Sequence, residues 1–66
     1  MGKHQQDFET ALASDELARQ TFSWLAPSHR HDFVSWIDAA VAERDRFTRI
    51  QAAVDILAGR EAVRRN

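Results

Sequence analysis

Apolar residues recur at intervals of three and four along nearly the whole chain, and this period restricts the fold more than any other feature. Phe8, Ala11 and Leu12 show it near the start, and Val54 and Leu57 show it near the end. Side chains at these intervals line one face of an α-helix, whereas a half-buried strand needs strict alternation, which no segment of strand length shows. The sequence therefore predicts an all-α protein.

The chain has 66 residues and no cysteine, so packing alone must stabilise it. A domain this small buries about 60% of the surface that its unfolded chain exposes, which leaves little room for a deep enzyme pocket. Hydrophobic residues make up 44% and charged residues 29%, which is typical of a folded domain. No apolar run has the length of a signal peptide or a membrane span, so we expect a cytoplasmic protein. The net charge of -1 predicts no general electrostatic attraction for nucleic acid or lipid.

Capping residues divide the first part of the chain into two helices. Asp7 is expected to cap a short leading helix that ends near Ala13. Ser14, followed by two acidic residues, is expected to cap a second helix that ends near Leu25. The apolar arc of this second helix is wide enough to face two neighbours, and it predicts that Trp24 lies in the core.

Pro27 and Gly59 delimit the second half of the helical pattern. Pro27 ends the second helix, and Ser28 is expected to cap a third helix over 29–42. The charged segment AERDR is expected to form a short loop. A fourth helix follows, with Phe47 on its apolar face, and Gly59 ends it in the left-handed conformation.

Together these elements predict one domain, a compact bundle of three main helices with a short leading N-terminal helix. The domain is expected over 7–59, between a disordered N-terminal tail over 1–6 and a basic C-terminal tail over 60–66. Trp36 is expected in the core. Ile56 falls outside the main apolar stripe of its helix and is a candidate for a contact patch.

The segment around Ser28 is a candidate anion site. A helix N-terminus presents free amides and a positive dipole, and His29, Arg30, Arg46 and Arg49 add positive charge if packing brings them together. An antiparallel third and fourth helix would instead leave Arg46 and Arg49 at the opposite end. The alternative is structural, with Arg30 on carboxylates or carbonyls at the end of the fourth helix. In this interpretation, favoured because half-buried charges usually form structural pairs, Arg46 and Arg49 pair with Asp38, Glu43 or Asp45.

No residue is assigned a catalytic or metal-binding role. His29 and His31 point about 160° apart on a helix, so they do not share a metal ion. The Ser28 hydroxyl is most simply used as a cap, and nothing in the sequence orients a base on it. The outward positions of the third helix are acidic and small, which would repel phosphate and disfavours a helix-turn-helix function. We therefore expect no catalysis, no cofactor and no nucleic-acid ligand.

The run PSHRHDFVSWIDAA, followed by RFTRI and LAG, carries a family resemblance. It is similar to the C-terminal helical region of the bacteriocin-protection, YdeI or OmpD-associated family, over roughly Phe8 to Gly59. The family usually has Lys, Thr and Arg where this chain has Val41, Asp45 and Thr48, so its basic cluster is reduced here. The matching positions are Ser28, His29, Arg30, Phe33, Trp36, Ile37, Ala40, Arg46, Arg49 and Ile50.

The resemblance implies a bacterial protein associated with stress or bacteriocin tolerance. We therefore expect a non-enzymatic helical interaction module whose partner is another protein, with the oligomeric state left open. The alternative is a small domain that binds an anion or a nucleotide phosphate at Ser28. The residues expected to form the structural motif are Pro27, Phe33, Trp36, Ile37 and Ile50.

Overall fold

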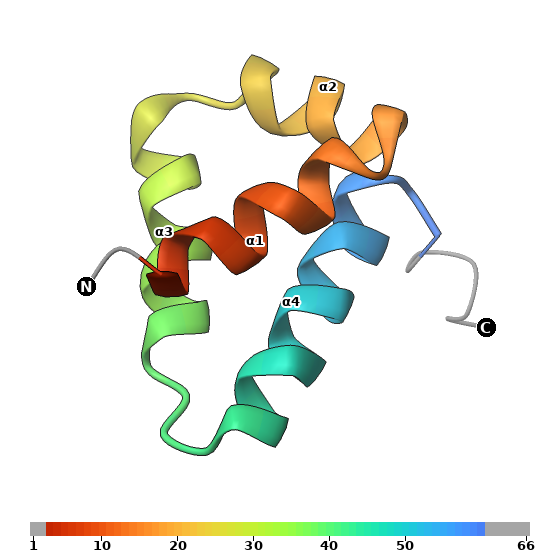
Figure 1. Cartoon of the computed structure of the whole chain (residues 1–66). Coiled ribbons are helices and arrows are strands. Elements are labelled where there is room, and N and C mark those ends of the chain that lie inside the picture. Colours follow the sequence, from red (N-terminus) through yellow and green to blue (C-terminus); the bar gives the residue numbers. More distant parts are fainter. Residues whose placement is uncertain (1–2, 61–66) are drawn as a thin grey trace, which may run out of the picture.

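A computed structural model describes residues 3–60, with side chains from residue 6 onward. Within this range the chain forms four helices and no strand (Figure 1), so the predicted all-α class is confirmed. Residues 61–66, which make up most of the predicted C-terminal tail, lie outside the described residues. The helices are α1 (Lys3–Ala13), α2 (Glu16–Trp24), α3 (Pro27–Asp38) and α4 (Glu43–Leu57).

Helix α1 is longer than the sequence suggested. It spans 11 residues against 9 for α2, so a bundle of three main helices with a short leading one is not an accurate description. The helix takes in residues 3–6, and Asp7 lies inside it rather than at its cap. The Asp7 carboxylate takes part in a tertiary contact, because it accepts two hydrogen bonds from Arg46 of α4.

Helix α4 is the central element, since α1, α2 and α3 all pack against it. Helices α3 and α4 run antiparallel through the loop 39–42, and α1 lies across α4 (Figure 1). The buried core draws on every helix. Its members are Phe8 and Leu12 of α1, Ala18 of α2, Ile37 of α3, and Ile50, Ala53, Val54 and Leu57 of α4.

Three phenylalanine rings tie α1, α2 and α3 together at the edge of this core. The centroids of Phe8 and Phe22 are 5.4 Å apart with the ring planes at 87°. The centroids of Phe22 and Phe33 are 6.4 Å apart at 70°. Both pairs are edge-to-face, the arrangement in which the positive edge of one ring meets the negative face of the next.

Two of the predicted caps are displaced by one or two residues. Asp15, not Ser14, caps α2, because its carboxylate accepts the backbone N–H of Ala18 at 3.2 Å. Ser14 instead donates its hydroxyl to the Thr10 carbonyl at 3.0 Å. Pro27 occupies the first turn of α3 and Ser28 follows it inside the helix, so Ser28 is not the cap. Proline fits there because the first helical N–H has no intrahelical acceptor.

The end of α4 matches the prediction at Gly59. Gly59 has φ 85, and its N–H donates to the Ile56 carbonyl at 3.1 Å. The Arg60 N–H donates to the Asp55 carbonyl at 2.8 Å. These two bonds form a Schellman motif, which satisfies carbonyls that the helix end leaves without intrahelical donors.

Three aromatic side chains expected in the core or on an apolar face are exposed instead, and one of them is Trp36, which is 42% exposed. Trp24 is 85% exposed at the last residue of α2, and Phe47 is 63% exposed on α4. Val41 is 97% exposed, because α3 ends at Asp38 and the loop covers 39–42 rather than the charged AERDR segment. In a domain this small the apolar arcs are wider than the faces that neighbouring helices cover.

Candidate functional site

The start of α3 carries three of the five residues predicted for the anion site, Ser28, His29 and the half-buried Arg30. Ser28 and His29 are exposed in its first turn. The N-cap residue is Ala26, and no side chain caps the helix there. The helix start is therefore open, as an anion site needs, but an open helix start is common and does not by itself make a site.

Arg30 is committed to the neighbouring helix end. Its guanidinium Nη1 donates to the Leu25 carbonyl at 2.9 Å and lies 3.5 Å from the Ser23 carbonyl. The structural interpretation placed Arg30 on the end of the fourth helix, and the structure corrects this to the end of the second. A cation at a helix C-terminus satisfies carbonyls that lack intrahelical donors and meets the negative end of the dipole.

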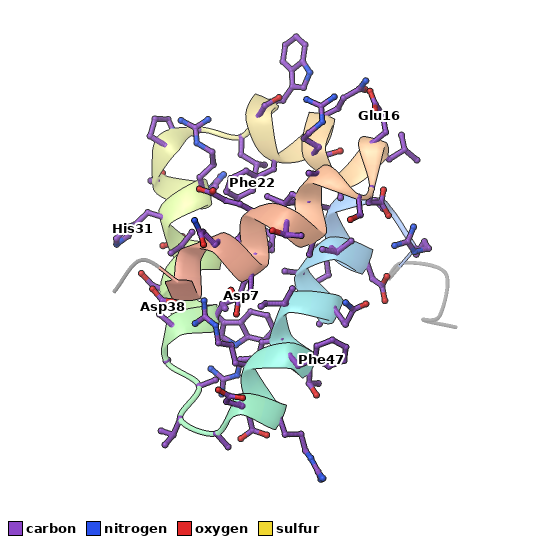
Figure 2. All side chains as sticks on the ribbon, viewed as in Figure 1. Asp7, Glu16, Phe22, His31, Asp38 and Phe47 are labelled. Carbon is purple, nitrogen blue, oxygen red and sulfur yellow. The ribbon has the colours of Figure 1, made fainter. Side chains whose placement is uncertain are left out.

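Arg46 is the one buried charged residue among those that the structure describes, with 7% of its surface exposed. Its Nε and Nη2 donate to the two carboxylate oxygens of Asp7, each at 2.9 Å, and Nη1 donates to Asp38 at 2.8 Å. Figure 2 labels these two acids on α1 and α3. The bonds to Asp7, and then those to Asp38, raise the pKa of Arg46 above its ordinary value although burial acts against this. The predicted pairing with Asp38 is confirmed, and the partner that sequence reasoning missed is Asp7.

Arg49 binds the end of α3 rather than an acidic side chain. Its Nη1 donates to the Trp36 carbonyl at 2.7 Å, and its guanidinium carbon lies 5.3 Å from the centroid of the Trp36 ring. This contact combines a charge-assisted hydrogen bond with a cation–π interaction. Trp36 is 42% exposed, so the guanidinium covers one face of a ring that water still reaches.

The structure does not bring the five predicted residues together. Helices α3 and α4 are antiparallel, so Ser28, His29 and Arg30 lie at the far end of α3 from the loop 39–42 (Figure 1). Arg46 and Arg49 lie in the first two turns of α4, beside that loop. Each of the three arginines donates to carboxylate or carbonyl oxygens of other elements, but only the Arg46–Asp38 pair is a contact that the structural interpretation named.

The structural motif residues hold the helices in place. Ile37 is fully buried and Ile50 is nearly so, while Phe33 is part-buried against the core. Pro27 fixes the start of α3, and Trp36 anchors Arg49. Ile56 is 44% exposed, in agreement with its predicted position outside the main stripe.

A groove lies between α1, the loop 39–42 and the first half of α4. Its volume is about 740 Å³. Sequence reasoning missed it because the groove joins segments that are far apart in the chain. Its lining residues are Gln6, Asp7, Thr10, Ala11, Ala40, Val41, Ala42, Glu43, Arg46, Phe47, Ile50 and Gln51.

The part of the chain that the structure describes offers few groups suited to catalysis, metal binding or membrane spanning. His31 and Ser35 lie one helical turn apart on α3, with Nε2 and Oγ 3.2 Å apart, and both are exposed. Across residues 6–60, no three His, Cys, Asp or Glu side chains gather closely enough to hold a metal ion. None of the described helices combines the length and apolarity that a bilayer span requires.

Arg60 forms a second ionic cluster at the opposite end of the molecule from the groove. Its Nη2 donates to Asp15 and to Asp55, each at 2.9 Å. The Ala18 N–H and, next, the Arg60 guanidinium lower the pKa of the Asp15 carboxyl. The cluster ties the end of α4 to the cap of α2, which is a structural role.

Comparison with known proteins identifies the family. No curated protein and no solved structure matches the chain. Residues 3–59 match the family described as Bacteriocin-protection, YdeI or OmpD-Associated. The match contains the SHR turn, the Trp36–Ile37 pair and Arg46, on which the resemblance was based. Because it spans most of the chain, this protein belongs to the bacteriocin-protection, YdeI or OmpD-associated family.

Proposed function

We propose that the chain is a non-catalytic module that binds another protein in the bacterial cytoplasm and contributes to bacteriocin or stress tolerance. The family description supports the link to bacteriocin protection. The observation that carries the binding role is the set of large apolar side chains that folding leaves in water. They are Leu17, Trp24, Trp36, Val41, Phe47 and Ile56.

A domain of this size has few large apolar side chains to bury. Burying one of them fully stabilises a fold by about 1.5–3 kcal/mol. Because Val41 and Phe47 are exposed, they contribute little of this stabilisation. Single exposed apolar residues are ordinary, but these two line the same groove. A shared apolar surface of this kind is typical of a binding site for another molecule.

Site-directed crosslinking in living bacteria tests the binding role. We would place a photoreactive amino acid at Phe47, in the groove, and at Gln20, an exposed position on α2. The proposal expects discrete crosslinked species from the Phe47 position and not from the Gln20 position. Equal crosslinking at both positions, or none at either, would contradict it.

Survival under bacteriocin exposure tests the cellular role. A host that expresses the chain should survive a bacteriocin active on that host better than one without it. The Phe47→Ser variant should lose this advantage while keeping its helical circular dichroism spectrum, because Phe47 is mostly exposed. Equal survival with and without the chain would refute the role in tolerance and leave the binding role to be judged by crosslinking.

Anion binding at the start of α3 is the alternative proposal. Its support is the exposed pair Ser28 and His29 at a helix start without a side-chain cap. It is the weaker of the two, since Arg30 already donates to the Leu25 carbonyl. An amide NMR titration with phosphate and with a nucleotide at fixed ionic strength tests it. Saturable shifts confined to 28–30 would support it, and their absence would reject it.

A further inference from the structure

The groove between α1, the loop 39–42 and α4 combines an apolar floor with acidic edges. Ala11, Ala40, Ala42 and Ile50 supply small and branched apolar surface, and Val41 and Phe47 stand exposed at its rim. The charged side chains among its described lining residues are Asp7, Glu43 and Arg46.

The positive charge of Arg46 does not balance the two acids at the groove surface. Arg46 is buried, whereas the side chain of Asp7 is 47% exposed and Glu43 is exposed. Among the described residues, the guanidinium already faces two carboxylates, Asp7 and Asp38, so these three side chains together carry one negative charge. A ligand in the groove therefore meets an apolar surface with exposed carboxylates at its edge.

We propose that this groove binds a short apolar protein segment that carries lysine or arginine beside its apolar residues. The inference rests on the proposed binding function and names the surface and the chemistry of the partner. A groove of about 740 Å³ accommodates a few side chains of one segment, not a whole second domain. Charge complementarity then favours a basic segment over an acidic one of equal apolarity.

A second copy of this chain fits the groove less well. The exposed apolar side chains of α2, Leu17 and Trp24, are the other large apolar surface. The basic residue beside them, Arg19, is already paired with Glu16 at 3.1 Å. That surface thus offers no free positive charge to match Asp7 and Glu43. Self-association is treated as an outcome of the test.

The test is an amide NMR titration of the full chain with synthetic peptides. The probe is an amphipathic peptide of leucine and lysine, and the control is the same peptide with glutamate in place of lysine. The proposal expects saturable shifts at 40–43, 47 and 50–51 with the lysine peptide and none with the glutamate peptide. Added salt should weaken the binding, because the charges concerned are exposed.

Three variants locate the binding. Phe47→Ser should weaken binding by about tenfold or more, because it removes a large apolar contact. Glu43→Gln should weaken it by about two- to fivefold at low salt, as expected for an exposed charge pair, and should reduce the salt dependence. Trp24→Ser is the matched control, since it removes an exposed aromatic side chain outside the groove. It should leave the affinity unchanged.

Each contrary outcome has a defined meaning. Equal binding of the lysine and glutamate peptides, or shifts outside the groove, would overturn the proposal. Shifts at 40–43 and 47 that depend on protein concentration without peptide would overturn it in favour of a second copy. Crosslinking from Phe47 in cells, combined with no binding of the lysine peptide, would reject the partner's chemistry while leaving the proposed function standing.

Discussion

The Asp7–Arg46–Asp38 cluster should couple three helices through one buried guanidinium. Asp7 belongs to α1, Asp38 to α3 and Arg46 to α4. Changing Asp7 to Asn keeps the size of the side chain and removes its charge. The change should therefore report on the electrostatic link between α1 and α4 without a cavity.

The expected loss of stability follows from the hydrogen bonds that Asp7 accepts from Arg46. A hydrogen bond to a charged group contributes about 1 kcal/mol more than a neutral one, and Asp7 accepts two. Because the Asp7 side chain is 47% exposed, solvent screening reduces the sum of about 2 kcal/mol by roughly half. The Asn amide group also turns one donor toward the guanidinium. We expect Asp7→Asn to lower the free energy of unfolding by about 1–2 kcal/mol.

Asp38→Asn should cost less, about 0.5–1 kcal/mol, because Asp38 accepts one bond. The double variant should cost more than the sum. It neutralises both of the carboxylates that the buried Arg46 guanidinium binds among the described residues, whereas each single variant keeps one of them charged. The coupling between the two sites should be about 1 kcal/mol.

Urea unfolding followed by far-ultraviolet circular dichroism measures these differences. A domain of this length has a total stability of about 3–10 kcal/mol, so the single variants should remain folded and the changes should be resolved. Wild-type stability in Asp7→Asn, or a double variant that equals the sum of the singles, would refute the argument that one buried charge couples the helices.

Three further changes test the core, the cap of α4 and the cap of α2. Ile37→Val should cost about 1 kcal/mol in urea unfolding because the side chain is fully buried, and no loss would mean that the core is loosely packed. Gly59→Ala should cost about 1 kcal/mol in thermal unfolding through its positive φ alone, since nothing lies within 4 Å of an added Cβ, and a gain in stability would contradict the Schellman assignment. Asp15→Asn should be less stable than wild type at neutral pH. Because the pKa of Asp15 is lowered in the folded state, its contribution is complete above about pH 3.8 and is lost as the pH falls further, so the gap should close in acid, and a gap independent of pH would contradict the ionic contribution.

Local signals account for the elements that were predicted correctly. Pro27 limits the backbone of the preceding residue, and Gly59 adopts a positive φ, so both act within a few residues of their own position. The burial of Ile37, Ile50, Val54 and Leu57 was recoverable from periodicity, because these side chains lie at the centre of their apolar arcs rather than at the edges.

The end of α3 shows where local signals fail. Residues 39–42 read Ala-Ala-Val-Ala and contain no glycine or proline, so periodicity extended the helix to Ala42. The helix ends at Asp38 instead, where α4 packs back on it. Arg49 binds the Trp36 carbonyl and Arg46 binds the Asp38 side chain. Both arginines belong to α4, so the contacts at the end of α3 come from a different helix.

The sequence by itself determined the helical class, the breaks at Pro27 and Gly59, the apolar stripe centred on Ile37 and Ile50, and the family, because each depends on neighbouring residues or on a pattern along the chain. The tertiary structure decided that Asp7 pairs with Arg46, 39 positions away, and that Trp24, Val41 and Phe47 remain exposed. Exposure depends on which faces other helices cover, and in a domain with few elements that area is smaller than the apolar surface the helices present. The acidic groove exists for the same reason, since α1, the loop and α4 form it only when packed together.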